Sequence, residues 1–361
     1  MRHIRCQNVT IITTPSNAQI LGKSIPLNQH LRIHTVPFPS QEVGLPDGVE
    51  SLSAATDFNN MVKIFQATTL LRPPIQHFVE QHPPDCIVTD FLFPWVDELA
   101  NKLQIPRLSF NGFSLFAICA MESVKAHSLY GYASFVIPGL PHSIVMNATP
   151  PKQMSEILGE RLEMVFKSQG ILVNNFVELD VVPEKKGKEN ESQEEKEKWL
   201  PKGFEERVIA KKKGLIIKGW APQVMILSHT VVGAFMTHCG WNSTVEAVSA
   251  GVPMITWPMH GEQFYNEKLI TQVRGIGGEV GAVEWCLVGI GEKEKLVGRD
   301  GIEKVVKRLM DNSYVAEIIR RHAREFGDKA KCAAQEGGSS HRNLTVLIND
   351  LKSLRDNKLL V

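Results

Sequence analysis

The sequence has no excess of charge of one sign and no long apolar run. Forty Lys and Arg residues stand against 39 Asp and Glu residues, which gives a formal net charge of +1 at pH 7. This balance gives no electrostatic reason to expect nucleic acid or an anionic membrane as a partner. No apolar stretch is long enough to cross a bilayer, and the start, MRHIRCQNVT, has no apolar signal-peptide core. We therefore expect neither nucleic-acid binding nor integral membrane association.

Cysteines at metal or redox spacing are also missing. The six cysteines are irregularly spaced, with no CxxC pair: Cys6, Cys86, Cys119, Cys239, Cys286 and Cys332. Such spacing is typical of free thiols in a reducing compartment, so we expect a cytoplasmic protein. Histidines and cysteines also lack the spacing of zinc ligands, which predicts that no metal is needed.

A complete glycine-rich dinucleotide motif is lacking as well. Neither Gly275-Ile276-Gly277-Gly278 nor Gly289-Ile290-Gly291 continues into G-x-G-x-x-G after a first strand with an acidic residue downstream. We therefore set aside a nicotinamide-dependent oxidoreductase.

The first half of the chain alternates short apolar runs with amphipathic segments. The runs predict strands at 9–14, 31–36, 86–90, 106–110 and 171–176. The segments predict helices at 58–80, with a break at Pro73-Pro74, and at 94–103, 115–127 and 155–167. This alternation predicts a parallel, doubly wound α/β sheet, and 361 residues suffice for two such domains.

The composition changes sharply in the middle of the chain. Between Glu184 and Lys198, 11 of 15 residues are Glu or Lys, which predicts a solvated linker. Beyond it the α/β pattern continues. Strands are predicted at 214–218, 231–237 and 275–283, and helices at 264–273, 301–310, 315–334 and 344–354.

The stretch 220–263 carries the strongest functional signal. At its centre an apolar run is followed by the turn HCGW (238–241) and by a short helix. We expect Asn242 and Ser243 to cap this helix and Gly251 to end it. A strand that passes through a glycine turn into a helix directs backbone N–H groups and the positive helix dipole at one place. A phosphate or another anion is therefore expected to bind there.

Further polar side chains surround this predicted anion site. His238 follows the strand directly, and Glu246 lies one turn inside the helix, where its carboxylate can accept hydrogen bonds from sugar hydroxyls. A second apolar run, 253–257, ends shortly before Glu262 and Gln263. Because ligands of open α/β sheets bind outside the carboxyl ends of strands, these residues predict one shared site.

The same stretch resembles the signature box of plant secondary-product UDP-glycosyltransferases. The resemblance rests on W-A-P-Q at 220–223, H-C-G-W-N-S-x-x-E at 238–246 and the acid–Gln pair at 262–263, spread over 44 positions as in that family. It extends over nearly the whole chain. It implies the GT-B arrangement, in which two Rossmann-like domains face each other across a cleft. The N-terminal domain would bind the acceptor and the C-terminal domain the nucleotide sugar.

The resemblance also implies how the chain is divided. An acceptor domain spans 1–180, a charged linker 181–199 and a nucleotide-sugar domain 200–340, and a helix at 341–361 packs back toward the first domain. A monomer is expected.

The resemblance further implies which residues bind the uridine part of the donor. Trp220 would stack on uracil, Ala221 would contact the base edge, and Gln223 would reach the ribose together with Glu246. Taken alone, Trp220 is typical of a core aromatic and Glu246 of a solvated helix carboxylate.

The phosphates and the sugar would be held by the rest of the box. The implied contacts come from His238, Gly240, Trp241, Asn242, Ser243, Glu262 and Gln263. His238 would donate to the diphosphate, and Glu262 and Gln263 would bind the hexose hydroxyls. The terminal Gln favours UDP-glucose over UDP-galactose or UDP-glucuronate.

The first departure from the family concerns its catalytic base. That base is a histidine between the first strand and the first helix, oriented by an aspartate that Asp90 matches. Taken alone, Asp90 would be an ordinary turn carboxylate. Residues 1–7 align with the end of the first helix, so the histidine has no counterpart. No matching motif surrounds His3, His30, His34 or His127.

The second departure follows Leu179-Asp180, where the sequence continues directly into Val181-Val182-Pro183. Family members have a linker, a strand with a glycine–serine turn and a helix at this place. Each domain is therefore expected to lack its first strand–helix unit, which leaves unpaired strand edges. We expect such a chain to fold poorly or to bind UDP weakly, without efficient transfer.

Two functions stay open at this point. One is an inverting UDP-glycosyltransferase that moves a hexose, with glucose favoured, to a hydroxyl of a small hydrophobic metabolite such as a triterpenoid, flavonoid or hormone, without a cofactor or metal. The other is an inactive or regulatory relic that binds UDP-sugar without the catalytic histidine.

Overall fold

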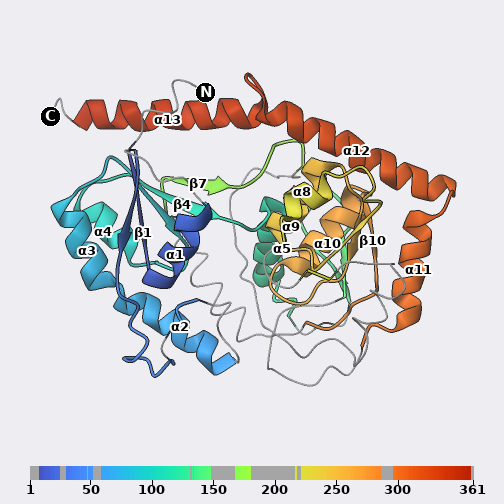
Figure 1. The fold of residues 1–361 in the computed structure, drawn as a ribbon, viewed down its shortest axis with the longest axis horizontal. Coiled ribbons are helices and arrows are strands. Elements are labelled where there is room, and N and C mark those ends of the chain that lie inside the picture. The colour runs from blue at the N-terminus through green and yellow to red at the C-terminus, as the bar shows by residue number, and fades with distance from the viewer. Residues whose placement is uncertain are drawn as a thin grey trace.

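The computed structural model describes residues 8–24, 30–46, 48–51, 58–130, 132, 134–147, 167–179, 216–217, 221–285 and 296–358. The charged linker, Trp220, and most of the predicted helix at 155–167 and strand at 214–218 lie outside these ranges. The described elements form two lobes, and the last two helices, α12 (Tyr314–Ala334) and α13 (Ser339–Lys358), run along the top of both (Figure 1).

The N-terminal lobe alternates strands and helices, as predicted. Its elements are β1 (Val9–Thr13), α1 (Pro15–Ser24), β2 (Leu31–Thr35), α2 (Phe58–Leu70), α3 (Arg72–Gln81), β3 (Ile87–Asp90), α4 (Val96–Lys102), β4 (Arg107–Asn111), α5 (Leu115–Ala126), β5 (Phe135–Val136), β6 (Val145–Met146) and β7 (Gly170–Val173). The five predicted strands are confirmed as β1, β2, β3, β4 and β7. Helix α1 and the antiparallel β5–β6 pair were not predicted.

The strands of this lobe form two separate parallel sheets. β1 pairs with β2, and β3, β4 and β7 form the other sheet in that order. No ladder joins β1 to β3 among the described residues, although Ile12 of β1 and Ile87 of β3 pack against one apolar cluster around Trp95 and Leu99. Among the described residues, the two sheets therefore share a helix layer and β1 and β3 each keep an unpaired edge, as expected for a sheet without a central strand.

The C-terminal lobe is built around one short parallel sheet of order β10–β9–β8. Its elements are α8 (Gln223–Leu227), β8 (Phe235–Thr237), α9 (Trp241–Ala250), β9 (Met254–Thr256), α10 (Gln263–Lys268), a π-helical turn at Leu269–Val273, β10 (Gly277–Glu279) and α11 (Arg299–Met310). Residues directly after β8 and β9 lie at the same edge of this sheet, because Thr237 and Thr256 are paired in register.

Several predicted boundaries were wrong; for example, the helix predicted at 344–354 already begins at Ser339. Two others have a local physical reason. The strand predicted at 231–237 begins only at Phe235, because the preceding residues form a turn after α8 in which Val231 is exposed. The break in the helix predicted at 58–80 falls at Leu71. Pro73 and Pro74 lie in the first turn of α3, where a missing N–H removes no helical hydrogen bond.

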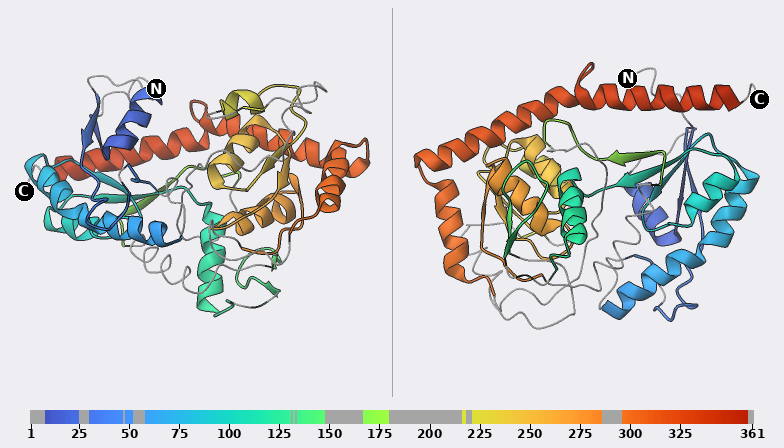
Figure 2. Two further views of the ribbon diagram at one scale, coloured as in Figure 1. Left: turned by 60° about the horizontal axis from the view of Figure 1, so that its bottom comes forward. Right: turned by 180° about the vertical axis from the view of Figure 1, so that it is seen from behind.

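Helix α5 belongs by sequence to the N-terminal lobe but packs into the core of the other lobe. Phe116, Ile118 and Val124 are buried in one apolar cluster that also contains Trp241 and Tyr265. Figure 1, and Figure 2 from behind, show α5 beside α10, and the two helices are in contact. The largest apolar core of the described chain is therefore shared by both lobes.

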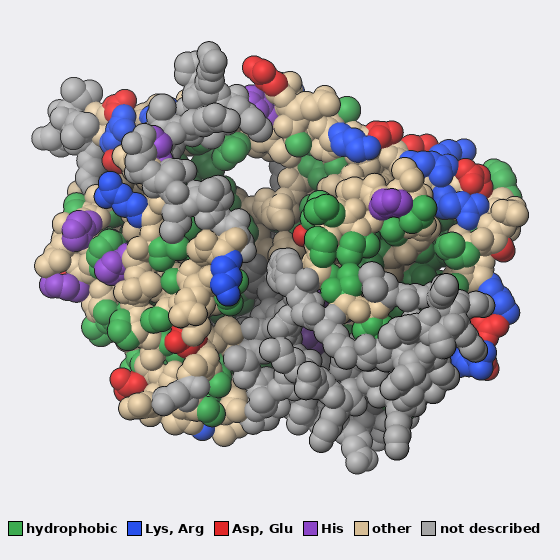
Figure 3. Space-filling view, in the orientation of Figure 1, with side chains coloured by type: hydrophobic (Ala, Val, Ile, Leu, Met, Phe, Trp, Pro, Cys, Tyr) green, Lys and Arg blue, Asp and Glu red, His purple; other side chains and the backbone are tan. Residues whose placement is uncertain are grey.

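The last helix ties the lobes together at their outer side. Ser339 at the start of α13 donates to Glu178 (Oγ to Oε2, 3.1 Å), and Arg355 near its end pairs with Asp85 of the N-terminal lobe (3.9 Å). Lys, Arg, Asp and Glu side chains alternate on the outer face of α11 and α12 (Figure 3). Exposed ion pairs contribute little, so apolar packing holds these helices. Among the described residues, no helix is both long and apolar enough to span a bilayer.

The packing of α12 on α9 yields a test of the fold. A methyl group at Gly327 would lie 2.9 Å from the backbone of Gly251, which ends α9 with a left-handed φ of +71°. Backbone atoms cannot yield cheaply, so Gly327→Ala should lower the free energy of unfolding by about 1–3 kcal/mol. Urea denaturation measures this change.

The control is Gly22→Ala in α1, where a methyl group meets open space. That substitution should leave stability unchanged or raise it by up to about 1 kcal/mol. A Gly327→Ala chain as stable as the wild type would contradict the close approach of the two helices.

Candidate functional site

The predicted anion site is a tight turn between β8 and α9. Cys239 has φ +71°, a left-handed conformation that few residues other than glycine adopt, and it is fully buried. Its N–H donates to Thr237 Oγ1 at 3.2 Å. The N-cap of α9 is Gly240, not Asn242 or Ser243 as predicted, and no side chain caps the helix. The extended backbone of Gly240 starts the helix one residue after the strained turn, so Asn242 and Ser243 fall inside the first turn.

The residues implied for the ribose form one connected group. Gln223 begins α8, and its Nε2 donates to Ser243 Oγ at 3.2 Å and to Glu246 Oε2 at 2.8 Å. Ala221 precedes it and accepts from the Gln223 N–H at 2.8 Å. Residues from two separate helices thus place a carboxylate, an amide and a hydroxyl beside the first turn of α9. Half-buried His238 follows β8 directly.

Trp241 and Asn242 meet the N-terminal lobe. Trp241 is fully buried, and its indole N–H donates to the carbonyl of Asn174 at 2.8 Å. The Asn174 side chain donates in turn to Asn242 Oδ1 at 3.2 Å. Asn174 directly follows β7, so the carboxyl end of the N-terminal sheet lies against the start of α9.

The side chains of Glu262 and Gln263 are buried. They are only 2% and 0% exposed. Gln263 Oε1 accepts from the N–H groups of Met259 (2.8 Å) and His260 (3.0 Å), and Glu262 Oε1 accepts from Asn266 Nδ2 at 3.3 Å. Both side chains hold the turn between β9 and α10 in shape, and their contacts with a sugar stay a prediction.

Asp90 lies at the carboxyl end of β3, half-buried, and its Oδ1 accepts from Leu92 N–H at 2.9 Å. Three histidines that lie outside any family motif make local contacts away from Asp90 in the sequence. His30 lies 3.1 Å from Asn8 Oδ1, His34 stacks on the ring of Phe78, and His127 contacts a carbonyl at the end of α5. His3 and Trp220 fall outside the described residues.

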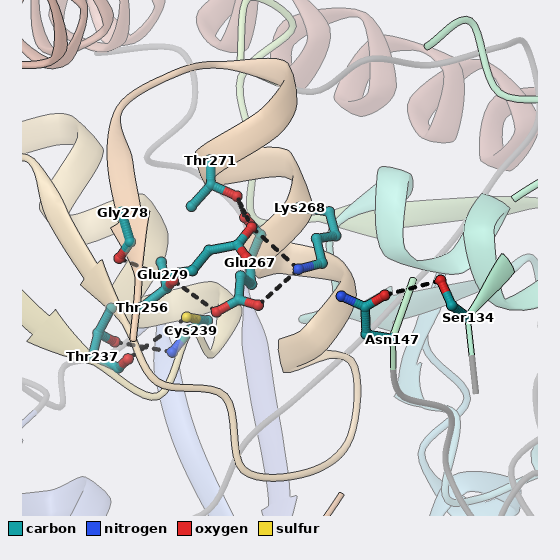
Figure 4. A network of polar contacts seen from close by, with 10 residues as sticks. All are labelled: Ser134, Asn147, Thr237, Cys239, Thr256, Glu267, Lys268, Thr271, Gly278 and Glu279. Atoms are coloured by element: carbon teal, nitrogen blue, oxygen red, sulfur yellow. Dashed lines mark hydrogen bonds and ion pairs between the residues drawn. The ribbon is translucent and has the colours of Figure 1, made fainter. Parts of the chain in front are cut away.

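A buried charge network that was not predicted lies just behind the site (Figure 4). Glu267 and Lys268 are 1% and 4% exposed. Thr256 Oγ1 donates to Glu267 (2.7 Å), and Lys268 Nζ reaches Glu267 (3.0 Å) and Glu279 (3.1 Å). These bonds attach α10 to both β9 and β10. A helical sequence such as QFYNEK gives no signal for this burial, because Glu and Lys are normally exposed.

Burial raises the pKa of the Glu267 carboxyl to about 7, although the Lys268 charge and the Thr256 hydroxyl oppose the shift. Burial alone would lower the pKa of Lys268, but the charges of Glu267 and Glu279 outweigh it and raise that pKa. Burial therefore favours the neutral form of Glu267, whereas the two nearby carboxylates favour the charged form of Lys268.

Comparison with known proteins places this geometry in a family. Residues 198–319 match the sequence profile described as UDP-glucoronosyl and UDP-glucosyl transferase. The UDP-glucosyl transferase 73CC6 of Saponaria officinalis is 37% identical, and the match covers 98% of this chain and 92% of that protein. The scopoletin glucosyltransferase of Nicotiana tabacum is 34% identical, with 95% and 92% covered. This chain belongs to the plant UDP-glycosyltransferases.

The solved structures agree with this assignment. Glycyrrhiza uralensis UGT73P12, solved with glycyrrhetinic acid 3-O-monoglucuronide, superposes with a TM-score of 0.82 at 30% identity, over 98% of this chain and 91% of that one. The fold of this UDP-glycosyltransferase is thus of the GT-B type, with two α/β lobes, and it is a transferase by family.

Within this family the chain is short. Its alignment with the Saponaria enzyme runs over 455 positions, although this chain has 361 residues, so about a hundred aligned positions are filled by the relative alone. Among the described residues, β1 and β2 form a sheet of their own, and the C-terminal sheet has three strands.

The buried Glu267 carboxyl of this UDP-glycosyltransferase predicts a pH dependence of stability. Its folded pKa of about 7 exceeds its ordinary value of 4.5, so the folded state holds the extra proton between these values. The free energy of unfolding should therefore fall, by about 1–3 kcal/mol, as pH rises through this window. Glu267→Gln should remove this part of the slope in urea denaturation between pH 5 and 7.5.

Exposed Glu325 on α12 supplies the matched control, since Glu325→Gln should keep the wild-type slope. Equal slopes for wild type and Glu267→Gln would show that Glu267 does not titrate in this range.

Proposed function

We propose that this UDP-glycosyltransferase transfers glucose from UDP-glucose to a hydroxyl of a small hydrophobic plant metabolite, such as a triterpenoid, a flavonoid or a hormone. The proposal rests on one observation above all. The Gln223 amide donates to both Ser243 and Glu246 beside the uncapped start of α9. This group offers ribose hydroxyls a carboxylate and offers phosphates the positive end of a helix dipole.

The negative charge of the leaving group, UDP, requires positive groups at its binding site. UDP departs with negative charge, which the first turn of α9 and His238 are placed to stabilise. Trp220 and Ala221 would hold the uracil. Gly240, Trp241 and Asn242 form the turn around the phosphates, and Glu262 and Gln263 supply the sugar-facing side.

The acceptor would enter from the N-terminal lobe. The carboxyl ends of β3, β4 and β7 share one edge, which places Asp90 on the side that meets α9 through Asn174. By resemblance, Asp90 matches the aspartate that orients the histidine base of the family, which removes the acceptor proton as the oxygen attacks the anomeric carbon with inversion. That histidine has no counterpart in this sequence.

The names of relatives support the donor and the acceptor class. They include a UDP-glucose flavonoid 3-O-glucosyltransferase of Fragaria ananassa, 34% identical, with 96% of this chain and 90% of that protein covered. We also propose a monomer in a reducing compartment. The described cysteines Cys86, Cys119, Cys239 and Cys332 are thiols outside any disulfide, in keeping with the cytosol.

UDP binding tests the proposed nucleotide site directly, because it needs no catalytic base. UDP at a hundredfold excess over its dissociation constant should stabilise the folded chain by about 2.7 kcal/mol, seen as a higher melting temperature. Glu246→Gln should weaken UDP binding by roughly tenfold or more, since a hydrogen bond to a charged group contributes about 1.5–3 kcal/mol.

The control is Glu325→Gln, at an exposed position that is far from the site in the sequence. This variant should bind UDP as the wild type does. A chain that melts cooperatively but is stabilised equally by ADP, or not at all by UDP, would refute the nucleotide site.

The donor and the absence of a metal requirement are tested by transfer. With a mixed panel of flavonoid and triterpenoid acceptors, UDP-glucose should give more glycoside than UDP-galactose or UDP-glucuronate, and EDTA should not change the yield. Product formation that stops with EDTA and returns with a divalent ion would contradict metal-free transfer, and preference for another UDP-sugar would contradict glucose.

A further inference from the structure

Asn266 contacts three separate parts of the proposed site at once. It lies in α10 and is fully buried. Its Nδ2 donates to the carbonyl of Cys239 (2.9 Å) and to Glu262 Oε1 (3.3 Å), and its Oδ1 accepts from Ser114 Oγ (2.7 Å). One amide thus joins the turn after β8, the turn before α10 and the start of α5.

The bond to Cys239 acts on the strained residue of the site. Cys239 has a left-handed backbone, which costs free energy for a residue with a side chain. It is held on both sides, by Thr237 Oγ1 at its N–H and by Asn266 at its carbonyl. These two bonds determine the direction in which the chain enters Gly240 and the first turn of α9.

The other two bonds connect the sugar side and the N-terminal lobe. Asn266 orients the carboxylate of Glu262, one of the predicted sugar ligands. Ser114 is the N-cap of α5: its hydroxyl oxygen accepts from Ala117 N–H (2.9 Å) while its O–H donates to Asn266. These bonds therefore fix the orientation of the Asn266 amide, with its nitrogen as donor and its oxygen as acceptor.

We propose that Asn266 is a positioning residue, which sets the geometry of the phosphate turn and of the Glu262 carboxylate together and links both to the acceptor lobe. The proposal deepens the proposed function and rests on it. Because Asn266 is fully buried, it would act on the donor only through Cys239 and Glu262.

The test is UDP affinity, measured by calorimetry well below the melting temperature of each variant. Asn266→Asp keeps the size of the side chain but cannot donate to the Cys239 carbonyl, and its charge repels Glu262. It should weaken UDP binding roughly tenfold or more. Asn266→Ser, which is too short to span both partners, should act in the same direction and decides the question if Asn266→Asp does not fold.

Two controls separate positioning from loss of stability. Tyr265→Phe changes the neighbouring residue of α10, whose buried hydroxyl has no partner among the described residues, and should leave UDP affinity within about twofold. Leu309→Ala removes a buried side chain from the second apolar cluster of the C-terminal lobe. It should lower the melting temperature but not the UDP affinity.

The outcomes differ for the two proposals. A wild-type chain that binds UDP, while both Asn266 variants bind it equally well at a lower melting temperature, overturns the positioning role alone. A folded wild-type chain that does not bind UDP overturns the nucleotide site and the positioning role with it.

Discussion

The site depends on a short helix that is buried although most of its residues are polar. All six residues of α10 are buried, and Gln263, Asn266, Glu267 and Lys268 all find hydrogen-bond partners inside the protein. A buried polar group without partners would cost several kcal/mol, so this helix is stable only in one position relative to its neighbours. The neighbours are β9, β10, the turn after β8 and the start of α5. Polar burial here specifies geometry more than it adds stability.

That constraint reaches across the two lobes. The side of α10 that carries Asn266 meets Ser114, and the apolar side chains of α5 continue the same core. Asn174 makes a second link between the lobes, because it joins the end of β7 to the first turn of α9 by hydrogen bonds. Both links lead to residues of the proposed site. The lobes therefore cannot separate here without disturbing the turn that would hold the phosphates.

Local sequence patterns predicted those features of the fold that depend on residues close together in the sequence. The signature box predicted the order strand, turn and helix, and Gly251 ends α9 in the left-handed conformation expected of it. The N-cap was missed because the left-handed turn at Cys239 leaves no trace in local propensity. The Ser114–Asn266 and Asn174–Asn242 bonds were beyond prediction because they join residues 152 and 68 positions apart. Burial of Glu267 was hidden as well, because Thr256, which donates to it, lies in β9, and its neighbour Lys268 pairs with Glu279 of β10.

The shortened sheets explain why such long-range polar bonds matter in this chain. Where β1 and β3 share only a helix layer, backbone ladders cannot fix one sheet against the other. In the described part of the C-terminal lobe the sheet has three short strands, and α5 supplies part of the core. With fewer ladder hydrogen bonds to define position, side-chain bonds carry more of that role. The amide of Asn266 and the carboxyl of the adjacent Glu267 do so where the start of α5 meets the turn after β8 and the turn before α10.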